Sequence, residues 1–260
     1  MATLAPASTV YGPVKSWRVG TSLGIDLLFV DSVCSFRCIY CQLGKINVHT
    51  SERKIYVPTA RVLADLKVAD WQSVDIITFS GSGEPTLAAN LGEVIGEVKR
   101  FTGKPVLVLT NAAHLNDIAV RRDLGRADKV FCKLDAVDED TFQKVDRPVA
   151  GVTLRGIVAG IKTLRQEFKG YLGIQFMLTE MNKQDVAALA EILNEIRPDE
   201  LQLNAPLRPV PHEWTIDTRG SHVATDPRVS NFKPVSRDEA QRIVTVLGEL
   251  TGLKIVSAYR

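Results

Sequence analysis

Three cysteines in one short stretch constrain this chain more than any other feature. Cys34, Cys38 and Cys41 stand within eight residues of one another in residues 33–44, VCSFRCIYCQLG. Their thiolates can surround one small centre of a soft metal, but a four-iron cluster needs four protein ligands before it is closed. Three ligands leave one iron open, and an open metal position is typical of catalytic sites. The spacing therefore favours a catalytic metal centre.

Two other interpretations of these cysteines stay open on spacing alone. One is a disulfide pair with a spare thiol. The start of the chain, MATLAPAST, has no signal-peptide pattern, so we expect a cytoplasmic protein, in which disulfides are rare. The other is a structural zinc site, whose fourth ligand could be Cys132, His49 or His114. A second motif is needed to decide among them.

The chain as a whole has the length and composition of an ordinary α/β protein. Its 260 residues suffice for one large domain or two small ones, and 45% of them are hydrophobic. No apolar run is long enough to span a bilayer, so we expect no membrane partner. A net charge of +2 and a pI near 8.3 fall short of the strongly basic surface typical of dedicated nucleic-acid binders.

Hydrophobic patterns alternate between strand and helix along most of the chain. Short apolar runs predict strands at residues 24–30, 75–79, 105–109, 129–134, 171–178 and 200–203. Amphipathic runs predict helices at residues 58–69, 90–100, 138–146, 152–168, 184–196 and 236–250. This alternation argues for an α/β fold, with a parallel sheet or barrel and helices outside. Because six strands are too few for an eight-unit barrel, we expect a partial (βα)6 TIM barrel that is open on one side.

Caps and breakers indicate where several elements begin and end. We expect Thr59 to cap the first helix, and Ser236 and Glu239 to form a capping box at the last one. Residues 205–234 contain five prolines and little periodicity, which predicts an irregular excursion that covers the open face. A final strand at residues 254–256 would close the edge of the sheet.

Unusual polar residues gather at one edge of the predicted sheet. In parallel α/β folds, the carboxyl ends of the strands hold the ligands and the catalytic groups. In the turn after the second strand, glycine lets the backbone approach a ligand, and Glu84 can receive an ammonium group, although glycine after a strand is more often only a turn. At or just beyond strand ends stand the cysteine stretch, the turn SGSGEPT of residues 80–86, Thr110, Asn111, Asp135 and Asn204.

Taken together, the two motifs resemble those of a known enzyme superfamily. The cysteine spacing and Gly83-Glu84 resemble the cluster loop and the Gly-Gly-Glu-type turn of radical S-adenosylmethionine (radical SAM) enzymes, with Ser82 interrupting the glycines. Nearly all of residues 11–204 is similar to the Fe–S oxidoreductase group that includes the tRNA wyosine-forming enzymes. The runs that carry this similarity are GPVKSWRVGTSLGID before the cysteines, CQLG after them, FSGSGEPTL, LTNAAHL and KLDAVDEDTF.

The resemblance implies a partial TIM barrel, a [4Fe–4S] cluster on the three cysteines, and SAM chelating the fourth iron. By motif position, Tyr40 is expected beside the adenine of SAM, and Gly83 and Glu84 near its methionyl amino group. A single radical SAM domain is expected over all 260 residues, with its core at about 18–204 and a C-terminal extension at 205–260. The residues expected to face SAM or substrate from the strand ends are Thr110, Asn111, Lys133 and Asp135.

The implied activity is reductive cleavage of SAM to a 5′-deoxyadenosyl radical that abstracts hydrogen from a substrate, with an electron donor such as flavodoxin or ferredoxin. Wyosine-forming enzymes carry further cysteines for a second cluster, and no cysteine precedes Cys34 here, so the substrate stays open. Candidate substrates are a tRNA base, a nucleoside or another small molecule. The alternatives are an activase or maturase acting on a protein or peptide, and a non-enzymatic iron–sulfur or zinc module.

Five further residues have two interpretations each. Cys132 is either a hydrogen donor to a product radical or a small buried hydrophobe. Lys133 and Asp135 share a face of their strand. They are either a pair near SAM or ordinary charges at a strand end. Arg147 and Arg208, each before a proline, either anchor an anionic substrate such as a phosphate or join surface salt bridges.

Overall fold

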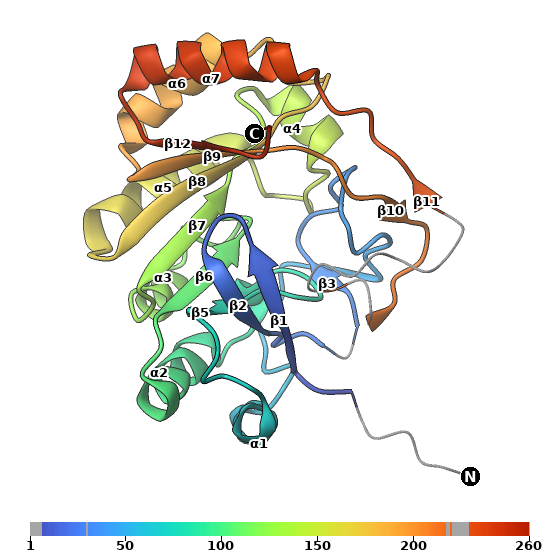
Figure 1. The fold of residues 1–260 in the computed structure, drawn as a ribbon, viewed down its shortest axis with the longest axis vertical. Coiled ribbons are helices and arrows are strands. Elements are labelled where there is room, and N and C mark those ends of the chain that lie inside the picture. The colour runs from blue at the N-terminus through green and yellow to red at the C-terminus, as the bar shows by residue number, and fades with distance from the viewer. Residues whose placement is uncertain (1–6, 30, 217–218, 220–228, 260) are drawn as a thin grey trace.

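The computed structural model describes residues 7–29, 31–216, 219 and 229–259, and one curled sheet dominates them. Its eight strands have the order β1-β2-β5-β6-β7-β8-β9-β12. The β1/β2 pair is antiparallel, and every other neighbouring pair is parallel. Figure 1 shows the sheet curled into a half barrel, with helices along its outer side. The predicted α/β partial barrel is confirmed.

The bounds of the elements agree closely with the sequence patterns. The strands of the large sheet are β1 (Val10–Ser16), β2 (Gly20–Ile25), β5 (Ile76–Phe79), β6 (Val106–Thr110), β7 (Lys129–Lys133), β8 (Tyr171–Met177), β9 (Glu200–Asn204) and β12 (Ile255–Ser257). The helices are α1 (Thr59–Val68), α2 (Leu91–Thr102), α3 (Ile118–Leu124), α4 (Glu139–Val145), α5 (Leu154–Glu167), α6 (Val186–Ile196) and α7 (Arg237–Thr251). The short elements are β3 (Val33–Cys34), β4 (Val48–His49), β10 (Val210–Pro211), β11 (Val229–Ser230) and the 3₁₀ turn η1 (Pro85–Leu87).

The first strand of the barrel differs from its prediction at both ends. We expected a strand at residues 24–30, but β2 begins at Gly20 and ends at Ile25. The chain turns there because the Asp26 carboxylate accepts a hydrogen bond from the Leu28 backbone N–H at 2.9 Å. The sequence pattern also missed β1, whose pairing with β2 adds an antiparallel strand at the edge of the sheet.

Helix ends show which caps the sequence predicted correctly. Pro58 occupies the N-cap position of α1 and Thr59 lies inside the helix, so the predicted Thr59 cap is wrong. At α7, the Ser236 side chain accepts from the Glu239 backbone N–H at 3.3 Å, as predicted. The reciprocal half of the capping box is missing, because the Glu239 carboxylate pairs with Lys183 instead. Helix α3, which Asp117 caps, was not predicted.

The two faces of the sheet bury different kinds of side chain. On β7, Val130 and Cys132 belong to the large core that includes the outer helices. Phe131 points to the inner face, where it packs with Ile76 and Leu107 near the amino ends of the strands. Cys132 is fully buried in the core, which agrees with the small buried hydrophobe and not with a hydrogen donor facing the lumen.

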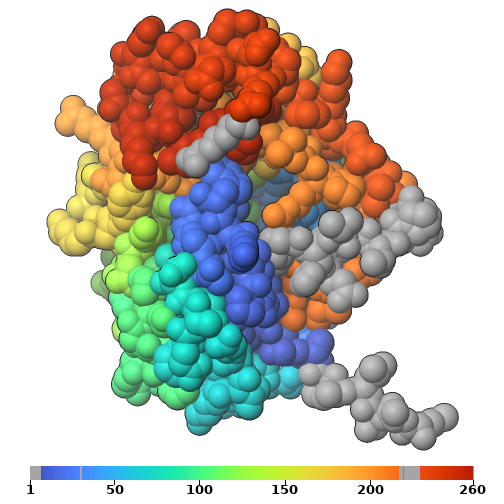
Figure 2. All heavy atoms as spheres, in the orientation of Figure 1, coloured from blue at the N-terminus to red at the C-terminus, as the bar shows by residue number. Residues whose placement is uncertain are grey.

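The excursion after β9 lies against the cysteine loop. Gly44, with φ of +72°, has the Pro211 carbonyl oxygen 2.3 Å from the position that a β-carbon would occupy. Figure 1 places this orange segment on the open side of the half barrel, and Figure 2 shows it next to the blue β1/β2 hairpin. The described part of the predicted cover therefore lies over the open side, while residues 217–218 and 220–228 of it are outside the described residues. No helix in the described ranges is long and apolar enough to cross a bilayer.

Glycine at position 173 sets the packing inside the barrel, which gives a test of the fold. A β-carbon on Gly173 would lie 2.4 Å from the Phe131 ring. We expect Gly173→Ala to lower the free energy of unfolding by about 1–3 kcal/mol through overpacking. The matched control is Gly96→Ala in α2, where the added methyl group meets only Arg126 at 3.6 Å and should stabilise the helix by about 0.5–1 kcal/mol. Urea unfolding measures both, and equal stability of the two variants would contradict the packing described here.

Candidate active site

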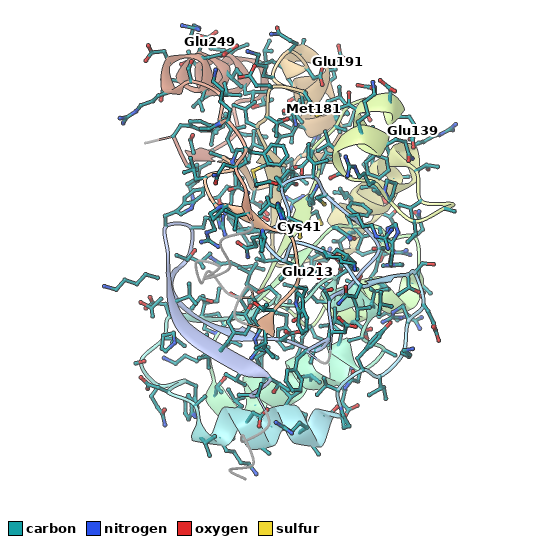
Figure 3. The ribbon with its side chains drawn as sticks, turned by 90° about the vertical axis from the view of Figure 1, so that its right-hand side faces the viewer. Cys41, Glu139, Met181, Glu191, Glu213 and Glu249 are labelled. Carbon is teal, nitrogen blue, oxygen red and sulfur yellow. The ribbon has the colours of Figure 1, made fainter. Side chains whose placement is uncertain are left out.

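The three cysteines lie in a loop that a neighbouring segment holds in place. Cys34 ends β3, and all three thiols are free and partly buried. The loop runs beside the residues that follow α4, where the Ile39 backbone N–H donates to the Val145 carbonyl at 2.9 Å and that of Arg37 donates to the Asp146 carbonyl at 3.0 Å. Figure 3 shows Cys41 near the middle of the molecule on the open side. The backbone of the loop is thus tied to the barrel, while its three thiols form no disulfide.

Burial affects the protonation of these thiols. It raises the pKa of Cys34, Cys38 and Cys41 above the ordinary value, and the charge of Glu84 adds to the shift at Cys34. The ammonium of Lys133 acts in the opposite direction on all three. Because a thiol must lose its proton to bind a metal, a metal centre here would be loaded with release of protons.

The geometry disfavours one metal ion held by four side chains. Within the described ranges, no three His, Cys, Asp or Glu side chains are arranged to hold a single ion. Of the fourth zinc ligands considered, Cys132 is buried in the core, and the His49 ring nitrogen Nε2 lies 3.1 Å from the Ser35 carbonyl oxygen. The buried His114 Nε2 has no hydrogen-bond partner among the described residues, but it forms no metal-ligand group with the cysteines there. Three partly buried thiols fit a cluster of several irons with one iron left open.

The glycine turn after β5 docks directly on the start of the cysteine loop. Val33 donates its backbone N–H to the Ser82 carbonyl at 2.8 Å, and Glu84 donates its own to the Val33 carbonyl at 3.0 Å. Gly83, with φ of +152°, has the Val33 carbonyl oxygen 1.6 Å from the position of a missing β-carbon. Only glycine fits there, so the turn and the cysteine loop form one unit.

Glu84 points into the protein and binds four donors there. Its carboxylate accepts hydrogen bonds from the Thr86 backbone N–H and hydroxyl at 3.1 and 2.7 Å, and from the Thr110 hydroxyl at 2.7 Å. The Asn111 backbone N–H donates to its other oxygen at 2.6 Å. The side chain is only 2% exposed. The carboxylate therefore joins the glycine turn to the end of β6, and the expected contact with an ammonium group remains a prediction.

Asn111 continues this connection to the cysteines. Its side-chain amide donates to the Ser35 hydroxyl at 3.0 Å and lies 3.6 Å from the Cys34 sulfur. The next residue, Ala112, has φ of +65°, a conformation that favours glycine. Thr110 and Asn111 thus lie close to the cysteine loop, as the sequence predicted for residues at strand ends.

A buried charged group lies on the other side of the cysteines. The Lys133 ammonium pairs with the carboxylates of Asp135 and Asp146 and lies 5.6 and 5.3 Å from the ring centroids of Phe36 and Tyr40. Burial alone would lower the pKa of Lys133, but the charge and hydrogen bond of Asp146, together with the charges of Cys38 and Cys34, raise that pKa. The Tyr40 hydroxyl donates to Asp135, whose pKa burial raises well above its ordinary value. The predicted Lys133–Asp135 pair is present, and Tyr40 joins it.

Comparison with known proteins identifies the family. Residues 30–193 match the model of the radical SAM superfamily, which spans more than half of the chain. The chain belongs to the radical SAM superfamily. It is 45% identical to a UPF0026 protein of Synechocystis over 98% of its own length and 97% of that protein, and 30% identical to a UPF0026 protein of Methanocaldococcus jannaschii over 93% of its length and 72% of that protein.

The fold is also shared with solved radical SAM structures. Streptococcus suis SuiB bound to S-adenosylmethionine superposes with a TM-score of 0.62 at 14% identity, over 90% of this chain. The chain spans 50% of the length of SuiB, so this likeness concerns the fold alone. Membership of the superfamily makes the protein a radical SAM enzyme and implies an iron–sulfur cluster and SAM. Such enzymes also need a reductant and a substrate.

Two buried groups of this radical SAM enzyme were not predicted from the sequence. The Asp26 carboxylate accepts from the Ser82 backbone N–H and hydroxyl at 3.1 and 2.6 Å, beneath the glycine turn. Arg219 of the excursion pairs with Asp26 at 3.2 Å and stacks over Tyr11. The second buried group is Asp146, and the only sequence feature that marked it was its position before Arg147-Pro148. Short-range patterns could not reveal these groups because their partners are far away in the sequence.

The hydrogen bonds of the Glu84 carboxylate can be tested by replacing one of its oxygen atoms. In Glu84→Gln, an amide N–H₂ replaces one carboxylate oxygen and faces a donor, so we expect the free energy of unfolding to fall by about 1–3 kcal/mol. The matched control is Glu191→Gln on the exposed face of α6, which should change it by less than about 0.5 kcal/mol. Urea unfolding under anaerobic conditions measures both. Equal stability of the two variants would show that the four hydrogen bonds are not formed.

Proposed function

We propose that Cys34, Cys38 and Cys41 bind a [4Fe–4S] cluster whose fourth iron chelates SAM. The observation that carries this proposal is that three free, partly buried thiols share one loop, which backbone hydrogen bonds join to the Gly83-Glu84 turn. Once bound, the cluster and SAM supply reductive cleavage to a 5′-deoxyadenosyl radical, which abstracts hydrogen from the substrate. The residues of the chain bind and orient these groups.

Four of the predicted cofactor-binding residues have positions that support such a role. Lys133 brings one positive charge close to the three thiolates, which offsets the cost of burying negative charge. Asn111 directs an amide N–H toward the Cys34 sulfur, and hydrogen bonds to cluster sulfurs tune reduction potentials. Gly83 leaves the backbone of the turn unobstructed for a ligand, and the Tyr40 ring lies on the cysteine loop near Lys133.

The substrate we favour is a polar small molecule or a nucleoside. Polar side chains line the inner face of the half barrel, where the Gln175 amide donates to Gln202 at 2.8 Å and Gln202 donates to Glu200 at 2.7 Å. The excursion also covers part of the open side, since the Gly44 position contacts Pro211 and Glu213. A covered mouth favours a small substrate over a tRNA base or a peptide such as the precursor peptide bound to SuiB. A flavodoxin or ferredoxin would supply the electron.

The roles of the cysteines can be tested against the fourth cysteine of the chain. We expect Cys38→Ala to lose the iron and the visible absorbance of the anaerobically reconstituted protein, and its 5′-deoxyadenosine formation with SAM and dithionite to fall to the level without enzyme. Cys132→Ala, a change in the core, should keep both the iron and the activity. The cluster assignment would be wrong if Cys38→Ala kept its iron, or if Cys132→Ala lost it as completely.

A further inference from the structure

Two arginines at the mouth of the half barrel have only neutral side-chain partners among the described residues. Arg18, in the turn between β1 and β2, donates to the Asn204 amide oxygen at 3.3 Å. Arg208, in the excursion, donates to the Gln42 amide oxygen at 2.5 Å. Neither is ion-paired in the part of the chain that the structure describes, although six other arginines are. Those six are Arg53, Arg61, Arg100, Arg121, Arg165 and Arg219.

The two guanidinium groups come from distant parts of the chain to one place. Asn204 is the last residue of β9, and Arg208 follows it by four residues. The hydrogen bond from Arg18 to Asn204 therefore places the β1/β2 hairpin next to the start of the excursion. Figure 2 shows the blue hairpin and the orange segment next to each other on one face. Gln42 directly follows Cys41, so Arg208 is also tied to the cysteine loop.

Arg18 binds a side chain of the inner face of the barrel, and Arg208 is an exposed residue tied to the cysteine loop. Sheet register places Lys133, Gln175 and Gln202 side by side on β7, β8 and β9, and pairs Met177 with Asn204 two residues further along β8 and β9. Residues two apart on a strand share a face, so the Asn204 amide that binds Arg18 belongs to the same face as Lys133. A group bound by the two arginines would therefore lie at the mouth of the half barrel, near the cysteine loop.

The positive charges of the two arginines repel each other. Arg18 is half-buried, and burial together with the charge of Arg208 lowers the pKa of Arg18 to about 10. Two cations held close without a neutralising carboxylate among the described residues cost free energy, and an anion between them would remove that cost. Guanidinium groups bind carboxylates and phosphates through paired N–H donors, which a lysine cannot do.

We propose that Arg18 and Arg208 form the binding site for an anionic group, a phosphate or a carboxylate, of the substrate. This inference rests on the proposed function and narrows it to substrates that carry such a group. Asn204 and Gln42 orient the two guanidinium groups through their amide oxygens. The anion ties the substrate to the hairpin, to the end of β9 and to the cysteine loop at once.

Direct binding of simple anions tests the site without turnover. Inorganic phosphate and acetate are titrated into the reconstituted, SAM-loaded enzyme at constant ionic strength, and heat of binding is measured by calorimetry. We expect Arg18→Gln and Arg208→Gln each to weaken binding of the preferred anion by about ten-fold or more. Arg155→Gln, on the exposed face of α5, should leave it unchanged. Preference for phosphate or for acetate assigns the substrate group as a phosphate or a carboxylate.

Three results would overturn the proposal. The first is that the wild-type enzyme binds neither anion, and the second is that both variants bind the anions as tightly as wild type does. The third is that both variants weaken only the binding of SAM, which would assign the arginines to the carboxylate of SAM. Formation of 5′-deoxyadenosine by wild-type enzyme from the same preparation tests the proposed function separately. Arginine-dependent anion binding without SAM cleavage would contradict the cluster chemistry and leave the anion site standing.

Discussion

The buried Glu84 carboxylate joins the three loops from which the site is built. It binds donors on its own turn and on Thr110 and Asn111, while the backbone on either side of Gly83 bonds to Val33 at the start of the cysteine loop. Hydrogen bonds to a buried charge are among the stronger ones in proteins, and an unpaired buried carboxylate costs far more than a pair. The loops consequently hold one arrangement relative to one another before any cofactor binds.

Charge balance is the second constraint on this site. Three thiolates close together repel one another, and burial favours their neutral forms. Lys133 supplies a cation within reach of all three, and Asp146 and Asp135 hold its ammonium in place. A lysine without these carboxylates would lose its proton more easily in such a buried position. Asp146 beside the cysteines therefore helps to preserve the positive charge that the thiolates need.

Local patterns in the sequence were sufficient for the alternation of strands and helices and for the edge of the sheet at which polar residues gather. The cysteine spacing, Gly83-Glu84 and the ends of β6 and β7 are short-range features, and β/α alternation brings strand ends together. The burial of Glu84 and the partners of Arg18, Asp26 and Asp146 could not be predicted, because each depends on a contact with a residue far away in the sequence. The β1/β2 hairpin was missed because only its second strand is strongly apolar.

The central claim is that three cysteines hold an iron–sulfur cluster with one iron accessible to SAM. Electron paramagnetic resonance of the anaerobically reconstituted, dithionite-reduced protein tests it most directly, with spectra recorded before and after addition of SAM. We predict a signal from a reduced [4Fe–4S] cluster whose g-values shift when SAM is added, because SAM binds the open iron. A signal that SAM leaves unchanged, or a protein that binds zinc and no iron, would contradict the account.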